Sequence, residues 1–311
     1  MDITTSYQHI AKIAATEASK TRWLIESLWL SEAVGLIGGP PKSCKSWLAI
    51  DMAVSIASAT NCLGHFPVLS PGPALIYLAE DNVLEVKERV TGICESRSLS
   101  LNDINLYTIT VPSLRLDEIK DQTLLRSIIE QVKPRLVVLD PLVRLHRQDE
   151  NNAKEMSALL SYFRELQRSY GCGVLLVHHA TKRSHERAGL NLRGSSDLHA
   201  FGDSNLYLAK RRDWLDLTIE HRSAAALEPL VLQLASDNTP AHLVVTNPPK
   251  EITAIPLSEE ILNKLKAAGK PLTRQSLRDL TAVNNQRLGD TLQELESQQK
   301  IQHHSNGWQI I

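Results

Sequence analysis

The chain has 311 residues, a length that predicts about two domains and a core large enough to fold without disulfides. Hydrophobic residues make up 42% and charged residues 22%, which excludes a fibrous repeat or a disordered tail as the bulk of the protein. With 34 basic and 35 acidic residues the net charge is −1, so any contact with nucleic acid must be local.

The N-terminus, the apolar runs and the cysteines predict a cytoplasmic protein without a membrane partner. No basic stretch followed by an apolar core begins the chain, so no secretory signal is expected. The apolar runs are strand-sized, well short of the roughly 20 residues of a membrane span. The four cysteines show no C-x-x-C spacing, which argues against a zinc module and predicts reduced thiols.

Short apolar runs alternate with helical periodicity over residues 24–237, a pattern typical of an α/β core with a mostly parallel sheet flanked by helices. Residues 1–23 are expected to form a helical arm before this core. The expected strands are 35–37, 74–78, 104–109, 136–139, 174–177 and 206–209, followed by a hairpin-like pair at 214–220 and 228–234. The expected helices are 46–58, 83–97, 124–131 and 153–170.

A phosphate-binding motif follows the first strand. Gly39, Lys45 and Ser46 hold the spacing G-x-x-x-x-G-K-[ST]. A loop between a strand and a helix N-terminus directs backbone N–H groups at one point, where the helix dipole favours phosphate. Lys45 is expected to bind the β- and γ-phosphates of ATP, and Ser46 to ligate Mg²⁺. The expected nucleotide contacts are Gly39, Pro40, Pro41, Lys42, Ser43, Cys44, Lys45, Ser46 and Trp47. A Pro-rich turn before an amphipathic helix is the alternative.

Cys44 occupies the position of the second glycine of the motif. A Cβ there narrows the phosphate cradle, although a helical backbone at Cys44 would make the penalty modest. The adjacent Lys45 and the helix N-terminus predict a lowered pKa for the thiol, and with it sensitivity to oxidation.

Acidic residues end two other strands. Asp140 follows 136–139 and is expected to act as the Walker B acid, which reaches Mg²⁺ through water. Glu80 follows 74–78 and is the candidate general base for the attacking water. Asp81 is expected to cap the next helix. A solvated or capping acid is the alternative for Asp140 alone, but the phosphate loop favours the catalytic interpretation.

Two adjacent histidines, His178 and His179, end the strand predicted at 174–177. Neighbours on a strand point to opposite faces, so the pair is poorly suited to bind one metal ion. One of them is expected to sense the γ-phosphate, and a structural histidine is the alternative.

The C-terminal part is predicted to be a separate unit. Residues 238–256 are rich in Pro, Asn and Thr and are expected to be a linker. Residues 257–311 show three amphipathic stretches and a tail with a Ser-Asn-Gly turn, which resembles a winged helix-turn-helix. The apolar stripes are Ile261, Leu262 and Leu265, then Leu277 and Leu280, then Leu288, Leu292 and Leu295. The third helix presents Asn285, Gln286 and Arg287 where a recognition helix contacts DNA. The net charge of residues 257–311 is close to neutral, which leaves a protein partner as the alternative to DNA.

The phosphate loop, a strand ending in AED, one ending in LD, one ending in HHA and then RGSS resemble, in this order, the RepA-type plasmid replicative helicases, which are RecA-like ring ATPases. The resemblance covers residues 24–234. It implies a RecA-like core that forms a homo-oligomeric ring, commonly a hexamer, with ATP between subunits. The roles that it implies are phosphate and magnesium binding for Lys45 and Ser46, water activation for Glu80, the magnesium-shell acid for Asp140 and the sensor for His179.

The resemblance also implies a cation that completes the active site of the neighbouring subunit. Arg222 lies in a segment resembling K-x-R-x-G, in which Glu220 replaces the lysine. The competing candidates are Arg193 and the cluster of Lys210, Arg211 and Arg212.

Two loops are expected to face the channel of such a ring. The first follows Asp140 and carries Arg144, His146 and Arg147, and the second, residues 181–193, carries Lys182, Arg183, Arg187 and Arg193. Cations repeated around a ring attract the phosphates of single-stranded DNA. Neither loop interleaves aromatic residues, which favours backbone tracking over base stacking. A solvated loop is the alternative.

The sequence therefore predicts a Mg²⁺-dependent ATPase of the RecA-like ring class, with a replicative helicase on single-stranded DNA as the specific function. A slow-turnover, ATP-dependent DNA loader or regulator is the alternative that Cys44 and Glu220 favour. A filament-forming recombination or repair ATPase is a further alternative.

Overall fold

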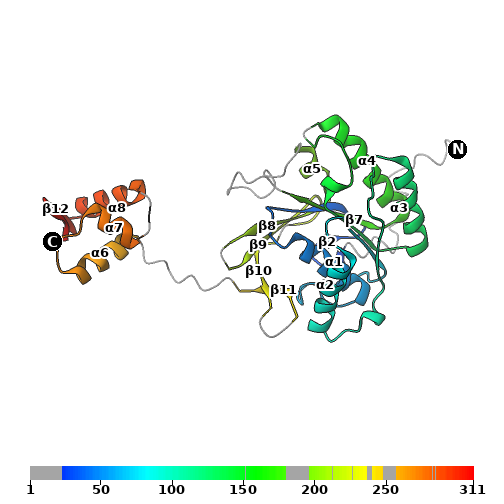
Figure 1. The fold of residues 1–311 in the computed structure, drawn as a ribbon, viewed down its shortest axis with the longest axis horizontal. Helices are drawn as coiled ribbons and strands as arrows, with labels where there is room; N and C mark the ends of the chain where they lie inside the picture. Colours follow the sequence, from blue (N-terminus) through cyan, green and yellow to red (C-terminus); the bar gives the residue numbers. More distant parts are fainter. Residues whose placement is uncertain are drawn as a thin grey trace, which may run out of the picture. The chain divides into compact units, whose positions relative to one another are not determined.

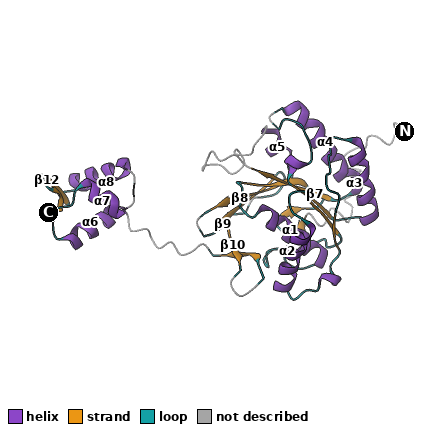
Figure 2. Ribbon diagram, in the orientation of Figure 1, coloured by secondary structure: helices purple, strands orange, loops and turns teal. Residues whose placement is uncertain are grey.

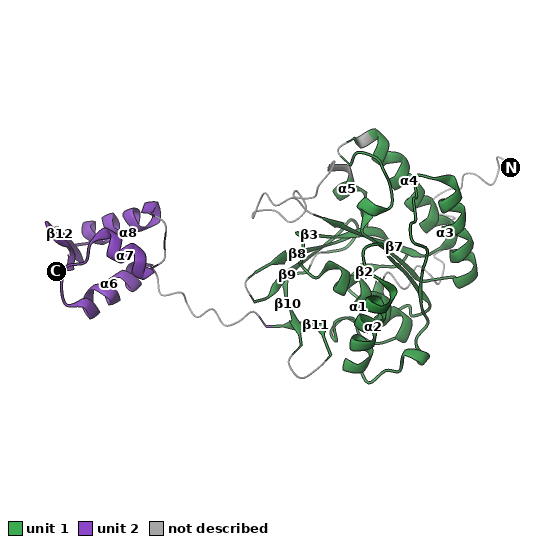
Figure 3. Ribbon diagram, viewed as in Figure 1, with its two compact units in different colours: residues 1–246 green, residues 247–311 purple. Residues whose placement is uncertain are grey.

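The structure is a computed structural model that describes residues 23–150, 152–179, 196–211, 213–225, 227–236, 240–247, 257–281, 283 and 285–311. The chain divides into two compact units, residues 1–246 and 247–311 (Figure 3). The predicted N-terminal arm, apart from Trp23, and the whole loop 181–193 lie outside the described residues. Within the described ranges, no helix has the length and apolar character that a membrane span requires.

The first unit is built on a nine-stranded sheet in the order β11-β10-β9-β8-β3-β7-β6-β4-β5 (Figure 1). The strands are β3 (Val34–Gly39), β4 (Ala74–Leu78), β5 (Leu106–Thr108), β6 (Leu136–Asp140), β7 (Gly173–His179), β8 (Ser204–Lys210), β9 (Leu215–His221), β10 (Leu230–Ala235) and β11 (His242–Thr246). Strands β3 to β8 run parallel, and β9, β10 and β11 extend the sheet as antiparallel strands. The predicted α/β class with a mostly parallel sheet is confirmed.

The parallel strands are buried on both faces, which explains their continuous apolar sequences. In β6, Leu136 and Val138 belong to one core cluster, whereas Val137 and Leu139 belong to the other. Adjacent side chains point to opposite faces of a sheet, so one apolar run supplies both cores.

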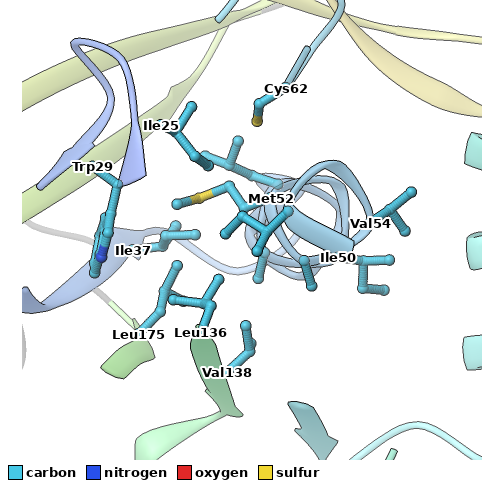
Figure 4. Packing of buried hydrophobic residues seen from close by; sticks show 14 of the residues in the cluster. Ile25, Trp29, Ile37, Ile50, Met52, Val54, Cys62, Leu136, Val138 and Leu175 are labelled. Carbon is cyan, nitrogen blue, oxygen red and sulfur yellow. The ribbon is translucent and has the colours of Figure 1, made fainter. Parts of the chain in front are cut away.

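Helices cover both faces of the sheet (Figure 2). The first face carries α1 (Lys45–Ser58) and α2 (Val83–Ser96), and the second carries α3 (Ile119–Val132) and α4 (Ala153–Tyr170). Met52 of α1 is fully buried on the side of the helix that faces Ile37, Leu136 and Leu175 of the strands (Figure 4). This packing holds the first turn of α1, which carries Lys45 and Ser46, against the sheet.

The short elements that the sequence did not predict include β1 (Trp23–Ile25), β2 (Trp29–Leu30), the helix α5 (Ser196–Phe201), β11, and the 3₁₀ turns Leu101–Asp103 and Leu142–Arg144. Strand β11 corrects the predicted linker, because residues 242–246 pair with all of β10 except its first residue. Its Leu243 is buried in the core of the first unit, which accounts for its order. The first unit thus continues to Thr246.

The second unit contains three helices followed by a two-stranded antiparallel hairpin. Its elements are α6 (Leu257–Ala268), α7 (Arg274–Thr281), α8 (Asn285–Ser297), β12 (Ile301–His304) and β13 (Gly307–Ile310). The predicted stripes form the core of the unit with one exception. Leu280 is 48% exposed, because it lies on the outer face of the short α7, so its predicted core position is wrong.

Candidate active site

The phosphate loop joins β3 to α1 and requires glycine at its first position. A Cβ on Gly39 would lie 2.6 Å from the carbonyl oxygen of Leu208 and 2.8 Å from Ser43 Oγ, closer than atoms approach without displacement. Ser43 is fully buried, and its hydroxyl donates to the Pro40 carbonyl at 2.8 Å. The turn is thus closed by its own polar groups, while Pro41 and Lys42 are exposed.

Lys45 lies buried beneath this turn, with 5% of its surface exposed. Its ammonium group donates to the carbonyl oxygens of Gly39 at 3.1 Å and Pro40 at 2.7 Å. Burial lowers the pKa of Lys45 to about 8, although Asp140, Cys44 and Glu80 act in the opposite direction. A buried cation held mainly by carbonyl dipoles suits an incoming anion, and a phosphate group would supply the counter-charge.

The structure shows the backbone conformation of Cys44 and corrects one expectation, which concerns its thiol. Its backbone is left-handed, with φ 59° and ψ 26°, rather than helical, so the residue takes the conformation for which the motif uses glycine. Such a conformation costs a non-glycine residue about 1–2 kcal/mol. Burial raises the pKa of its thiol, and this effect exceeds the lowering by Lys210 and Lys45. The predicted lowering of the thiol pKa is therefore wrong.

Trp47, the last predicted nucleotide contact, is half-buried in the first turn of α1. The guanidinium of Arg89 lies over its ring, 5.7 Å from the centroid. Arg89 also forms a two-bond ion pair with Asp81, at 2.8 and 2.9 Å. The helix cap predicted for Asp81 is wrong, because the Asn82 side chain accepts the hydrogen bond from Glu85 N instead.

Asp140 ends β6 next to the phosphate loop and is 6% exposed. Burial raises the pKa of its carboxyl group to about 6, whereas the Ser46 hydroxyl and Lys45 lower it. Its Oδ2 is buried, and no described residue donates a hydrogen bond to this atom. A carboxylate oxygen in need of a partner, beside a hydroxyl and an expected phosphate, fits the few protein ligands that Mg²⁺ takes. Asp140 and Ser46 would hold the ion.

Glu80 lies just beyond the end of β4, and the β4–β6 register aligns Leu78 with Asp140. Its carboxylate accepts a hydrogen bond from Arg144 Nε at 2.8 Å. Both side chains are about half exposed, Glu80 at 45% and Arg144 at 58%. The sequence predicted Arg144 as a DNA contact and Glu80 as a base, and it gave no sign that the two meet.

The two histidines of β7 have different surroundings. The β3–β7 register pairs His179 with Gly39, which brings it beside the phosphate loop. His178 is 2% exposed, and its Nδ1 lies 3.7 Å from Glu150 Oε1, which in turn lies 3.8 Å from Nε2 of the buried His146. His146 of the predicted channel loop therefore lies inside the unit rather than on its surface, and burial lowers its pKa.

Arg222 lies at the far end of the sheet from the phosphate loop. Strand β9 runs antiparallel to β8, so the end of β9 pairs with Ser204 at the start of β8. Arg222 Nη1 lies 3.4 Å from Asp203 Oδ1, and Nη2 donates to the Phe201 carbonyl at 3.2 Å. The side chain of Arg222 is 53% exposed. Glu220 lies 3.7 Å from His199.

Of the remaining predicted contacts, Arg147 is 71% exposed and pairs with Glu118 at 3.2 Å. At the start of α8, Asn285, Gln286 and Arg287 are all exposed. The predicted DNA contacts and finger candidates outside the described residues are Lys182, Arg183, Arg187, Arg193 and Arg212. Sequence reasoning missed the position of Lys210, which lies close enough to Cys44 of its own phosphate loop to influence the thiol.

Comparison with known proteins agrees with this geometry. Residues 5–185, more than half of the chain, match the family described as AAA domain. A solved structure of the ATPase domain of G40P has a TM-score of 0.54 to this chain at 13% identity, covering 70% of this chain and 87% of that one. This likeness extends to the fold, which is that of a RecA-like P-loop ATPase. The chain belongs to the AAA domain family.

Proposed function

We propose that the chain is a Mg²⁺-dependent ATP hydrolase of the RecA-like ring class, and that it acts as a replicative helicase of the RepA type on single-stranded DNA. The observation that carries the proposal is the convergence of Lys45, Ser46, Glu80 and Asp140. These residues lie at or just after the carboxyl ends of β3, β4 and β6. The three strands belong to the consecutive stretch β3-β7-β6-β4 of one sheet. Ligands of open α/β sheets bind at this edge.

The residues supply each part of an in-line hydrolysis. Lys45 and the backbone of the loop would bind the phosphates, and Ser46 and Asp140 would hold the cation. Bound Mg²⁺ would neutralise charge on the phosphate oxygens. Glu80 takes a proton from water, the water oxygen bonds to the γ-phosphorus, and the bond from that phosphorus to the bridging oxygen breaks to release ADP. His179, beside Gly39, is the candidate sensor of the γ-phosphate.

The hydrolysis part is tested with the Glu80→Gln variant. Glutamine keeps the shape of the side chain but accepts no proton, so we expect Mg·ATP binding close to that of the native protein and phosphate release slower by about 10²–10⁴-fold. Glu165→Gln, which removes an exposed carboxylate of α4, is the control. Calorimetry that detects no Mg·ATP binding by the reduced native protein would contradict the proposal.

The DNA part is tested separately, with oligo-dT and a forked duplex. Exposed cations after Asp140 support a contact with phosphates, and we expect oligo-dT to stimulate hydrolysis and the fork to be unwound. Sedimentation with Mg²⁺ and an ATP analogue measures the ring, which we expect to be a hexamer. Hydrolysis without unwinding would support the ATPase assignment and contradict the helicase assignment.

A slow-turnover loader or regulator is the second candidate, and two observations favour it. Cys44 strains the phosphate loop, and Arg222 is engaged within its own chain by Asp203. This alternative predicts ATP-dependent oligomers with little hydrolysis, whereas a recombination ATPase would form open filaments.

The second unit is proposed to be a winged helix that binds DNA through the start of α8. Binding of duplex DNA by residues 247–311, measured in the intact chain, tests this role against docking of a protein partner.

A further inference from the structure

A single ion pair joins the proposed base to the proposed DNA-binding loop. Glu80 follows β4, and Arg144 ends the short 3₁₀ turn Leu142–Arg144 that follows Asp140 on the adjacent strand β6. Arg144 Nε donates to Glu80 Oε1 at 2.8 Å. The two residues are far apart in the sequence and meet only because β4 and β6 pair in parallel.

The backbone beneath Arg144 is fastened while its side chain is exposed. Arg115 Nη1 donates to the carbonyl oxygens of Arg144 at 2.8 Å and His146 at 3.1 Å. The amide of Leu116 donates to the Leu145 carbonyl at 2.6 Å. The side chain of Arg144, by contrast, is 58% exposed. The loop can therefore exchange the partner of this side chain without moving its backbone.

We propose that Arg144 is a positioning residue that holds the Glu80 carboxylate until a phosphodiester of single-stranded DNA takes its place. The proposal rests on the proposed function and names the regulation of that same site. Guanidinium groups bind carboxylate and phosphate with the same donor fork, so the two anions compete for one cation. DNA in the channel then releases Glu80 to accept the proton of the attacking water.

The exposure of the pair sets the size of the effect. Exposed ion pairs shift equilibria by up to about fivefold, which corresponds to about 1 kcal/mol. A hold of this strength suppresses hydrolysis without DNA by the same factor and is weak enough for a DNA phosphate to displace it. Binding linkage is reciprocal, so Glu80 must weaken the binding of DNA by as much as DNA frees Glu80.

The first test compares ATP hydrolysis with and without oligo-dT in native protein, Arg144→Gln and Arg144→Lys. We expect Arg144→Gln to hydrolyse up to about fivefold faster without DNA, at an unchanged KM for Mg·ATP, and to lose stimulation by the same factor. Lysine keeps a charge for both anions and should restore the low rate without DNA. The ion pair of Arg126 with Glu165, at 3.1 Å, provides the matched control, and Arg126→Gln should leave both rates unchanged.

The second test needs no hydrolysis, so it separates this inference from the proposed ATPase. Binding of fluorescent oligo-dT is measured for Glu80→Gln, Arg144→Gln and the double variant, with Glu165→Gln as the control for lost charge. We expect Glu80→Gln to bind up to about fivefold more tightly, and this gain to vanish in the Arg144→Gln background. A gain that persists without Arg144, no gain at all, or slower hydrolysis by Arg144→Gln without DNA would each overturn the proposal.

Discussion

The phosphate loop and the Glu80–Arg144 ion pair at the neighbouring strand ends hold their polar groups in opposite ways. In the loop, Lys45 and Ser43 are buried and donate to backbone carbonyls of the same turn. In the ion pair, by contrast, the side chains of Glu80 and Arg144 are each about half exposed to solvent. The first arrangement is fixed by the fold, and the second is open to exchange.

This difference suggests a division of labour. Groups that receive phosphate are built in advance, which removes the cost of ordering them when the ligand binds. In the proposed mechanism, the groups that respond to DNA keep a weak partner that is easily replaced. Four variants test the comparison, from the largest expected effect to the smallest.

The largest effect is expected beneath the loop, at Gly35 of β3. A Cβ at this position would lie 1.7 Å from the carbonyl oxygen of Ser204 on the adjacent β8. We expect Gly35→Ala to lower the free energy of unfolding by about 4 kcal/mol or more, measured by urea denaturation. Gly64→Ala is the control, because its Cβ meets no atom within 4 Å and only the positive φ opposes it. Equal losses of unfolding free energy in the two variants would contradict the conclusion that the close approach of β3 and β8 requires glycine at position 35.

The next effect concerns binding rather than folding. Lys45→Ala removes the buried cation, so we expect hydrolysis to fall by about 10²–10³-fold and Mg·ATP binding to disappear in calorimetry. Folding stability should change little or increase, because burying a charge is unfavourable. Lys42→Ala, in the exposed part of the same loop, should lose less than about tenfold. Similar losses in both variants would mean that burial confers no special role on Lys45.

A smaller gain is expected at Cys44. Glycine adopts its left-handed backbone without strain, so Cys44→Gly should raise the free energy of unfolding by about 1 kcal/mol. Cys44→Ala removes the thiol and keeps the strain, and it should show no such gain. A large increase in turnover by Cys44→Gly would show in addition that the native loop is not fully competent.

The smallest effect is a pH dependence at His146. Burial lowers the pKa of its imidazole. As the pH falls through the unfolded value of about 6.5, the unfolded chain takes up a proton that the folded chain resists, so stability is lost on acidification. His146→Asn should therefore lose less stability than the native protein between about pH 8 and about pH 5 in thermal unfolding. Parallel losses would remove His146 from the pH response.

Much of the fold follows from local sequence signals. Helix α4 has the predicted bounds because Asn152 accepts hydrogen bonds from Lys154 N and Glu155 N at its start, and Gly171 adopts a left-handed backbone at its end. Strand β11 was missed because its order depends on pairing with β10, and no local pattern records that contact.

The site was predictable in composition but not in electrostatics. The spacing of the motif identified Lys45 and Ser46, and strand ends identified Glu80 and Asp140. The positive φ and raised pKa of Cys44 depend on how the turn is buried, which the motif does not encode. The pairing of Glu80 with Arg144 requires the register of β4 and β6, which sequence alone did not supply.

The antiparallel course of β9 has a consequence for assembly. It leaves Arg222 opposite Asp203, whereas Gly39 at the start of the phosphate loop lies against Leu208, five residues further along the chain, or about 17 Å. No rotamer spans that length, so under the proposed function Arg222 would act at the nucleotide of another copy placed head to tail. In the proposed ring, loss of this arginine would then slow hydrolysis at the neighbouring subunit and leave the pocket of its own subunit intact.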